Sequence, residues 1–144
     1  MADLYQEDIV LWSERQADAL RRRAANEIDW DNVAEEIEDV GRSEINGTLS
    51  QIDNILRHRI YLLGWPDSLS VRRWTAELAE FERQLHRCYR PSMTTGGEAK
   101  VTDAFVHEAY FAALRYCLAH MDTGPTVQLP EACPWLLSEI LSGA

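Results

Sequence analysis

Side chains of the kinds that bind zinc occur in the second half of the chain. Cys117 and His120 are three residues apart and would share one face of a helix, and zinc accepts thiolate and imidazole in tetrahedral sites. Cys133 and either His86 or Cys88 could complete the set, but His86 and Cys88 are two residues apart and point in different directions on a helix. Core residues with satisfied hydrogen bonds explain the same pattern more simply. We therefore expect no bound metal and no cofactor.

A second set of residues that could take part in catalysis or metal binding lies between residues 29 and 63. Glu36, Glu44 and His58 share one expected helix there. Glu44 continues an apolar stripe from Val40 to Thr48, so we expect it to be partly buried in an ion pair with an arginine. His58 lies roughly 21 Å further along that helix, so the two cannot act on one atom. We expect His58 to be a hydrogen-bonded packing residue, and the alternative is that a carboxylate here binds metal or transfers protons.

Signature motifs of the common enzyme classes are missing from the sequence. There is no Walker-type loop, no Gly-x-Gly-x-x-Gly and no Glu-x-x-His pair of a di-iron bundle. The segment 41–45 lacks the last glycine of a nucleophile elbow, and the segment 107–111 lacks the second histidine of a zinc protease. We expect no catalytic residue, and the sequence leans away from an enzyme.

Acidic residues are concentrated where the long helix is expected to begin. Glu35, Glu36, Glu38 and Asp39 form either a solvated helix face or a docking surface for a basic partner. Trp30 follows Asp29, a good helix N-cap, and we expect its indole to be buried at the joint between the first two helices. Three other tryptophans are also expected in the core rather than in a ligand cage: Trp12, Trp74 and Trp135.

Composition and charge limit the class of protein. The 144 residues are 46% apolar, enough for a single domain over 1–144 with a real core. Net charge is −10, with −8 in residues 1–44, +2 in 45–97 and −4 in 98–144. Such an acidic chain is a poor binder of nucleic acid, because binding requires neutralisation of phosphates. With no long apolar segment and no signal peptide, we expect a cytoplasmic protein without a membrane partner.

Apolar residues repeat at helical spacing along the whole chain, and strand-like alternation is absent. The pattern predicts an all-α helical bundle of four main helices, the second of them long, plus a short C-terminal helix. The expected ranges are 4–24, 29–63, from Ser68 or Ser70 to about residue 90, 102–123, and a short helix after Pro134. The fourth helix is apolar nearly all round and is expected to be the most buried.

The long helix also suggests an assembly. Because this helix would be longer than its neighbours, we expect one end of its apolar stripe to remain uncovered, flanked by Arg57 and Arg59. The residues at that end are Ile52, Ile55, Leu56, Ile60 and Leu63. A homodimer would cover them, whereas a bend at Gly41 or Gly47 would instead let a monomer bury its own stripe.

The run Asp-Trp-Asp-Asn-Val-Ala-Glu-Glu-Ile-Glu at 29–38, followed by Gly-Arg-Ser-Glu at 41–44, resembles the signature of a bacterial family. The closing Pro-x-x-Cys-Pro-Trp at 130–135 agrees with it. The family is the one called "domain of unknown function twenty-nine". The resemblance implies an almost wholly helical bacterial protein, and it brings no reaction, cofactor or catalytic residue.

Two functional classes remain open from the sequence. The first is a non-catalytic protein-interaction or self-associating module, with a protein partner or a second copy as its ligand. The second is an enzyme or metal-binding protein with an unrecognised site in the bundle. Small-molecule ligands are not indicated by any motif. The candidate interaction or structural-polar positions are Trp30, Glu35, Glu36, Glu44, His58 and Trp74.

Overall fold

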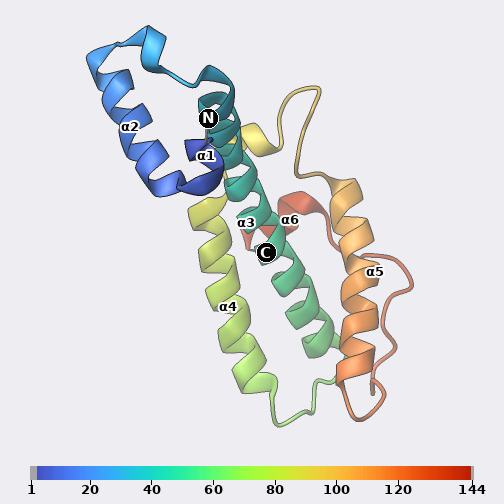
Figure 1. Ribbon diagram of the computed structural model, residues 1–144. Coiled ribbons are helices and arrows are strands. Elements are labelled where there is room, and N and C mark those ends of the chain that lie inside the picture. The colour runs from blue at the N-terminus through green and yellow to red at the C-terminus, as the bar shows by residue number, and fades with distance from the viewer. Residues whose placement is uncertain (1–2, 144) are drawn as a thin grey trace. The chain divides into compact units, whose positions relative to one another are not determined.

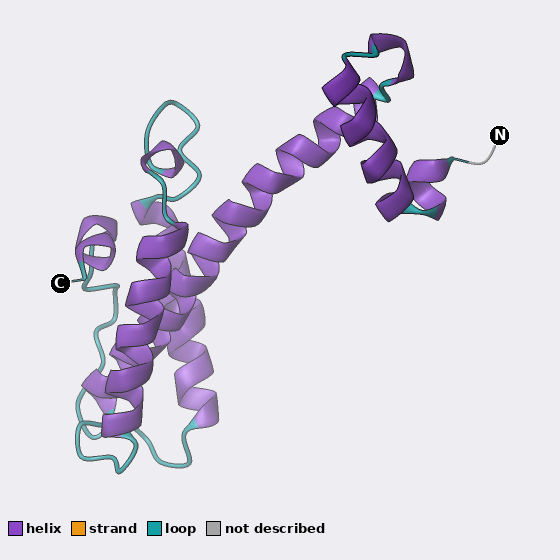
Figure 2. Ribbon diagram, turned by 90° about the vertical axis from the view of Figure 1, so that its left-hand side faces the viewer, coloured by secondary structure: helices purple, strands orange, loops and turns teal. Residues whose placement is uncertain are grey.

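The protein is all-helical in the computed structural model, which describes residues 3–143. Figure 2 shows helices joined by loops, and within the described residues no strand is present. The all-α prediction is confirmed. The α-helices are α1 (Leu4–Glu7), α2 (Ile9–Arg22), α3 (Trp30–Gly64), α4 (Val71–Cys88), α5 (Asp103–His120) and α6 (Leu137–Ser142). Two short 3₁₀ helices cover Ala25–Glu27 and Pro91–Met93. None of the helices is long and apolar enough to cross a membrane, as far as the described residues extend.

The chain divides into two compact units, which we describe separately. The N-terminal unit extends to Ser43 and the C-terminal unit begins at Glu44, so α3 contributes residues to both. This helix has 35 residues and is continuous through Gly41 and Gly47, so neither glycine ends it. It ends at Gly64, one residue beyond the predicted end.

The N-terminal unit contains two helices where the sequence pattern predicts one. Asp3 caps α1, since its carboxylate accepts a hydrogen bond from the backbone N–H of Tyr5. Asp8 ends α1 and caps α2 by accepting from the N–H of Leu11 at 2.9 Å. The prediction of one helix over 4–24 was wrong because the apolar period continues across Asp8, while the capping preference of Asp8 starts a new helix.

The C-terminal unit has its core between the second half of α3 and the helices α4, α5 and α6 (Figure 1). The α3 residues Ile52, Ile55, Leu56 and Ile60 are completely buried in it. Of the stripe that we expected to be uncovered, only Leu63 is exposed, at 40%. That expectation was wrong because α4 and α5 both lie along this part of α3 and cover it (Figure 1).

Helix α5 begins as predicted, and five of its 18 residues are buried, a larger share than in α2, α3 or α4. The hydroxyl of Thr102 accepts a hydrogen bond from the N–H of Phe105, which caps the first turn. One face is buried through Val106 and Tyr110, but Phe111 and Leu118 are exposed. The helix ends at His120, and the residues up to Gly124 belong to the following loop.

The C-terminal end of α3 is completed by residues from the loop after α5. The Gly64 carbonyl accepts hydrogen bonds from the N–H of Thr126 at 2.8 Å and from its hydroxyl at 3.3 Å. The Trp65 indole N–H donates to the carbonyl of Thr123 at 2.9 Å. Glycine at position 64 leaves room for this loop, because a Cβ there would lie 3.2 Å from side-chain atoms of both Leu129 and Pro125.

Candidate functional site

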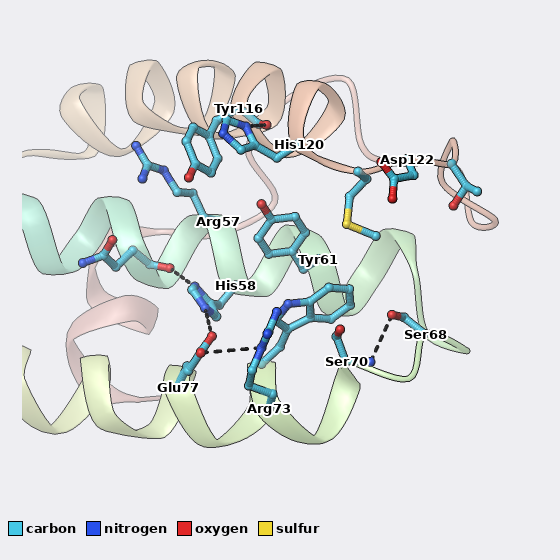
Figure 3. A pocket seen from close by; sticks show the side chains of 14 residues that line it. Arg57, His58, Tyr61, Ser68, Ser70, Arg73, Glu77, Tyr116, His120 and Asp122 are labelled. Atoms are coloured by element: carbon cyan, nitrogen blue, oxygen red, sulfur yellow. Dashed lines mark hydrogen bonds and ion pairs between the residues drawn. The ribbon is translucent and has the colours of Figure 1, made fainter.

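A polar cleft of about 670 Å³ opens in the C-terminal unit. Its walls come from α3, from α4 and the loop before it, and from the end of α5 with the loop that follows (Figure 3). The volume lies in the range of ligand-binding pockets, about 300–1,000 Å³. We call this the polar cleft.

His58 is held in the polar cleft by hydrogen bonds at both ring nitrogens. Its Nδ1 lies 2.8 Å from the carbonyl oxygen of Asn54, and its Nε2 lies 2.8 Å from Oε2 of Glu77 on α4. The side chain is 13% exposed, and the Phe81 ring packs edge-on at 4.9 Å. The prediction that His58 is a hydrogen-bonded packing residue is confirmed.

The two hydrogen bonds of His58 fix the number of protons in the pair. A carbonyl oxygen only accepts, so Nδ1 carries a proton. The contact between Nε2 and Glu77 then needs a second proton, either on the ring or on the carboxyl group. In both arrangements His58 and Glu77 together are neutral. With both nitrogens engaged, His58 has no free lone pair with which to act as a general base toward a ligand.

Two stacked aromatic rings form part of the wall of the polar cleft. Trp74 on α4 stacks on Tyr61 of α3 with 4.9 Å between ring centroids and 13° between planes. Both residues are buried, so the expectation for Trp74 is confirmed. Burial raises the pKa of Tyr61 to about 12, and the neighbouring Cys117 adds to that shift. The Tyr61 phenol is therefore protonated at neutral pH.

Arg57 forms the opposite wall with two rings of α5. Its guanidinium carbon lies 3.9 Å from the centroid of the Tyr116 ring, which in turn stacks on His120 at 3.8 Å. The Nε atom of Arg57 is buried and has no hydrogen-bond partner among the described residues. A buried charged donor without a partner is rare in native proteins, and leaving one unsatisfied costs about 1–3 kcal/mol.

Cys117, one of the residues that could in principle bind zinc, is poorly suited to metal binding or covalent chemistry. Cys117 is fully buried, and its thiol donates to the Arg57 carbonyl at 3.4 Å. Burial raises the pKa of this thiol to about 11, so the thiolate that binds metal or attacks a substrate is scarce at neutral pH. No three His, Cys, Asp or Glu side chains converge on a point that could hold a metal ion in the described part of the chain.

The N-terminal unit contains a second concave surface, which is apolar. It lies between α2 and the first part of α3, with a volume of about 280 Å³. Ile37 and Val40 line it from α3 at 66% and 67% exposure, and Leu20 lines it from α2. The buried Trp12 forms part of its lining, and the Trp12 indole N–H donates to Asp29. We call this surface the N-terminal groove.

Ion pairs organise the acidic run beside the N-terminal groove. Arg42 contacts Glu35 at 2.9 Å, Glu38 at 3.4 Å and Asp39, all within α3. Glu36 instead accepts a hydrogen bond from the Tyr5 hydroxyl at 2.7 Å, which raises the pKa of Tyr5 to about 12. The acidic run thus includes internally paired surface charges and one carboxylate that ties α1 to α3.

A family model described as "Domain of unknown function DUF29" matches residues 4–144. The chain belongs to this family. No curated protein matches the sequence. Among solved structures, the chain is similar to the crystal structure of an α-helical protein of unknown function from Rhodospirillum rubrum, with 24% identity and a TM-score of 0.67. The likeness covers 98% of this chain and 90% of that chain, and at this identity it shows the fold alone.

Two positions in the family signature behave differently from our expectations. Trp30 is 58% exposed, and its indole N–H donates to the carbonyl of Ala25 at 3.2 Å. It does not anchor a buried joint, because Trp12 already occupies the space between α2 and α3 and Asp29 turns toward Trp12. Glu44 is exposed rather than partly buried, and no ion pair from it is seen in the described residues. The stripe that suggested its burial becomes buried only from Thr48 onward.

The structure brings together cleft residues that sequence reasoning did not group. Arg57, Arg73 and Glu77 join His58 and Trp74 in the polar cleft. Part of this could be found from spacing, since Trp74 and Glu77 are three apart and share a face of α4. The partnership of α3 with Tyr116 needed the three-dimensional fold, because 59 positions separate Arg57 from Tyr116 in the sequence.

Proposed function

We propose that this member of the DUF29 family is a non-catalytic protein-interaction module whose N-terminal groove binds an amphipathic helix with basic edges. The observation that carries the proposal is the apolar lining of the groove. Ile37 and Val40 are about two-thirds exposed side by side on one helix face, opposite Leu20. Neighbouring exposed apolar side chains in a concave surface are typical of protein contacts.

The geometry of the groove suits a helix as its occupant. Two helices form its walls, and Ile37 and Val40 lie three residues apart on α3, so a third helix could place residues at positions i and i+3 or i+4 between them. Burying one exposed isoleucine or valine contributes about 1.5–3 kcal/mol. Two such contacts together would supply a large part of a micromolar affinity, which corresponds to about −8 kcal/mol.

Charge selects a basic partner over a second copy of this chain. Residues 1–43 hold 12 acidic and 5 basic side chains, for a net charge of −7. The neighbours of the groove-lining residues include Glu14 and Asp18 on α2 and Glu38 and Asp39 on α3. Lysine or arginine residues flanking the apolar face of a partner helix would meet these acids, whereas a second N-terminal unit would bring a like charge.

The test uses a designed amphipathic peptide of leucine and lysine, with a leucine and glutamate peptide of the same pattern as control. Titration calorimetry should detect binding of the lysine peptide alone. The double substitution Ile37→Ser, Val40→Ser should weaken binding at least tenfold, because it removes apolar contacts without changing charge. The matched control is Leu118→Ser, which removes an exposed apolar side chain from α5.

Equal binding of the lysine peptide by the wild type and the Ile37, Val40 variant would contradict the groove as the site and leave only non-specific charge attraction. The homodimer is the alternative occupant. Light scattering on a size-exclusion column separates it: a mass of twice 16.5 kDa that falls to 16.5 kDa in the same double variant would assign the groove to a second copy.

A further inference from the structure

The polar cleft of the C-terminal unit has a positive charge excess within an acidic protein. Arg57 and Arg73 line it, and its acidic lining residues are Glu77 and Asp122. His58 and Glu77 count as zero, because their hydrogen-bonded pair is neutral in either protonation arrangement. Arg73 lies 3.7 Å from Glu77, and its side chain is 68% exposed, so it can turn toward a ligand.

Arg57 contributes a buried donor, its Nε–H, that has no hydrogen-bond partner among the described residues. The stacking on Tyr116 fixes the guanidinium without satisfying that donor. Asp53 is the nearest carboxylate along the helix, one turn away, and no hydrogen bond or ion pair joins the two in residues 3–143. Burial raises the pKa of Asp53, with Arg57 acting against that shift.

We propose that the polar cleft is a binding site for a small organic oxyanion, held by Arg57 and Arg73. Guanidinium groups match the geometry of carboxylate and phosphate oxygens, and both classes of anion share this chemistry. A volume of about 670 Å³ exceeds what an inorganic ion needs, so the ligand carries an organic body as well. Ser68 and Ser70 lie at the end of the cleft away from Arg57 and offer hydroxyl groups to that body (Figure 3).

A cationic ligand fits the same residues poorly. Glu77 is already hydrogen-bonded to His58 and contacts Arg73, so Asp122 is the other carboxylate in a lining that includes two arginines. One exposed carboxylate in water attracts a cation weakly, and the arginines oppose it. The excess of positive over negative charge in the lining therefore favours an anionic ligand.

The experiment is a nuclear magnetic resonance titration of the full chain with two probes: glutarate for carboxylates and glycerol 2-phosphate for phosphates. Glycerol and sodium chloride at matched ionic strength are the controls. The expected result is a saturable shift of the Arg57 Nε–H signal and of the amides around His58 with one or both anions. The probe that saturates at the lower concentration identifies the preferred anion class.

Variants decide whether the arginines are responsible. Arg73→Gln and Arg57→Lys should each weaken binding at least tenfold, whereas Arg72→Gln, on the neighbouring exposed position of α4, should leave it unchanged. Arg73 is exposed, so its substitution keeps the test valid even where Arg57→Lys disturbs the packing on Tyr116. Shifts equal to those with sodium chloride, or binding that survives both substitutions, would overturn the proposal.

Discussion

Trp30 fits the predicted start of a helix, but its indole is exposed where the sequence predicts that it is buried. The Asp29-Trp30 pair marks the start of α3 correctly, since the N–H of Val33 donates to the Asp29 carbonyl at 2.9 Å. Capping is a local property and can be predicted from neighbours. Burial depends on which other side chains reach the same space, and Trp12 from α2 occupies it instead of Trp30.

The exposure of Trp30 leads to a prediction about stability. Trp30→Ala should lower the free energy of unfolding by about 0.5–1 kcal/mol, because most of the indole is already in water. Trp12→Ala is the matched control and should cost about 3–5 kcal/mol, since that indole is buried and hydrogen-bonded to Asp29. Urea denaturation measures both. Equal losses would show that the Trp30 ring contributes packing that its exposure conceals.

The candidate-site residues were predictable to different degrees. The sequence predicts that His58 is hydrogen-bonded, but its partner Glu77 lies 19 positions away on another helix. No periodic pattern specifies which residues of two helices meet. The sequence predicts that Arg57 flanks an exposed stripe, whereas in the fold its guanidinium lies over the Tyr116 ring of α5.

At the level of elements, the presence of each helix was easier to predict than its boundaries or which neighbouring helices bury its apolar face. Helical spacing of apolar residues predicted α3, α4 and α5 correctly. The same spacing could not show that Ile52 and Ile60 are buried, because an apolar stripe looks identical whether a neighbouring helix or a second chain covers it. The boundary at Asp8 was missed for a related reason, since the apolar period continues across the break between α1 and α2.

Two glycines of α3 should respond in opposite ways to substitution. A Cβ at Gly41 would meet nothing within 4 Å, so Gly41→Ala should stabilise the helix by about 1 kcal/mol through backbone entropy and helix propensity. Gly64→Ala should destabilise, because its Cβ would approach Leu129 and Pro125 at 3.2 Å. Denaturation followed by circular dichroism gives both values. A loss of stability in Gly41→Ala would mean that residue 41 also adopts a backbone conformation other than that of the continuous helix.

At the scale of the whole molecule, buried weak acids make stability depend on alkaline pH. The pKa of Cys117 rises from 9.0 to about 11 and that of Tyr61 from 10.0 to about 12, in both cases mainly through burial. The folded state therefore keeps protons that the unfolded chain releases. This stabilisation is complete below about pH 9 and is lost as the pH rises through 9 to 12.

The prediction that follows concerns the slope of stability against pH. The free energy of unfolding should fall between pH 8.5 and pH 11, and the fall should be smaller in Cys117→Ala, which removes one of the titrating groups. Thermal denaturation at a series of pH values in constant ionic strength measures the slope. The slope rather than the absolute stability is the readout, because the substitution also changes core packing. An identical slope in the variant would show that Cys117 ionises equally in both states.

The closure of α3 by residues beyond α5 has a consequence for the order of events during protein synthesis. The Gly64 carbonyl accepts its hydrogen bonds from Thr126, which is synthesised 62 residues later. At about 5–20 residues per second, the ribosome needs about 3–12 s to supply them. During that interval neither the hydrogen bond from Thr126 to the Gly64 carbonyl nor the one from the Trp65 indole to the Thr123 carbonyl can form. The residues of the longest helix are therefore synthesised seconds before the residues that complete its C-terminal end.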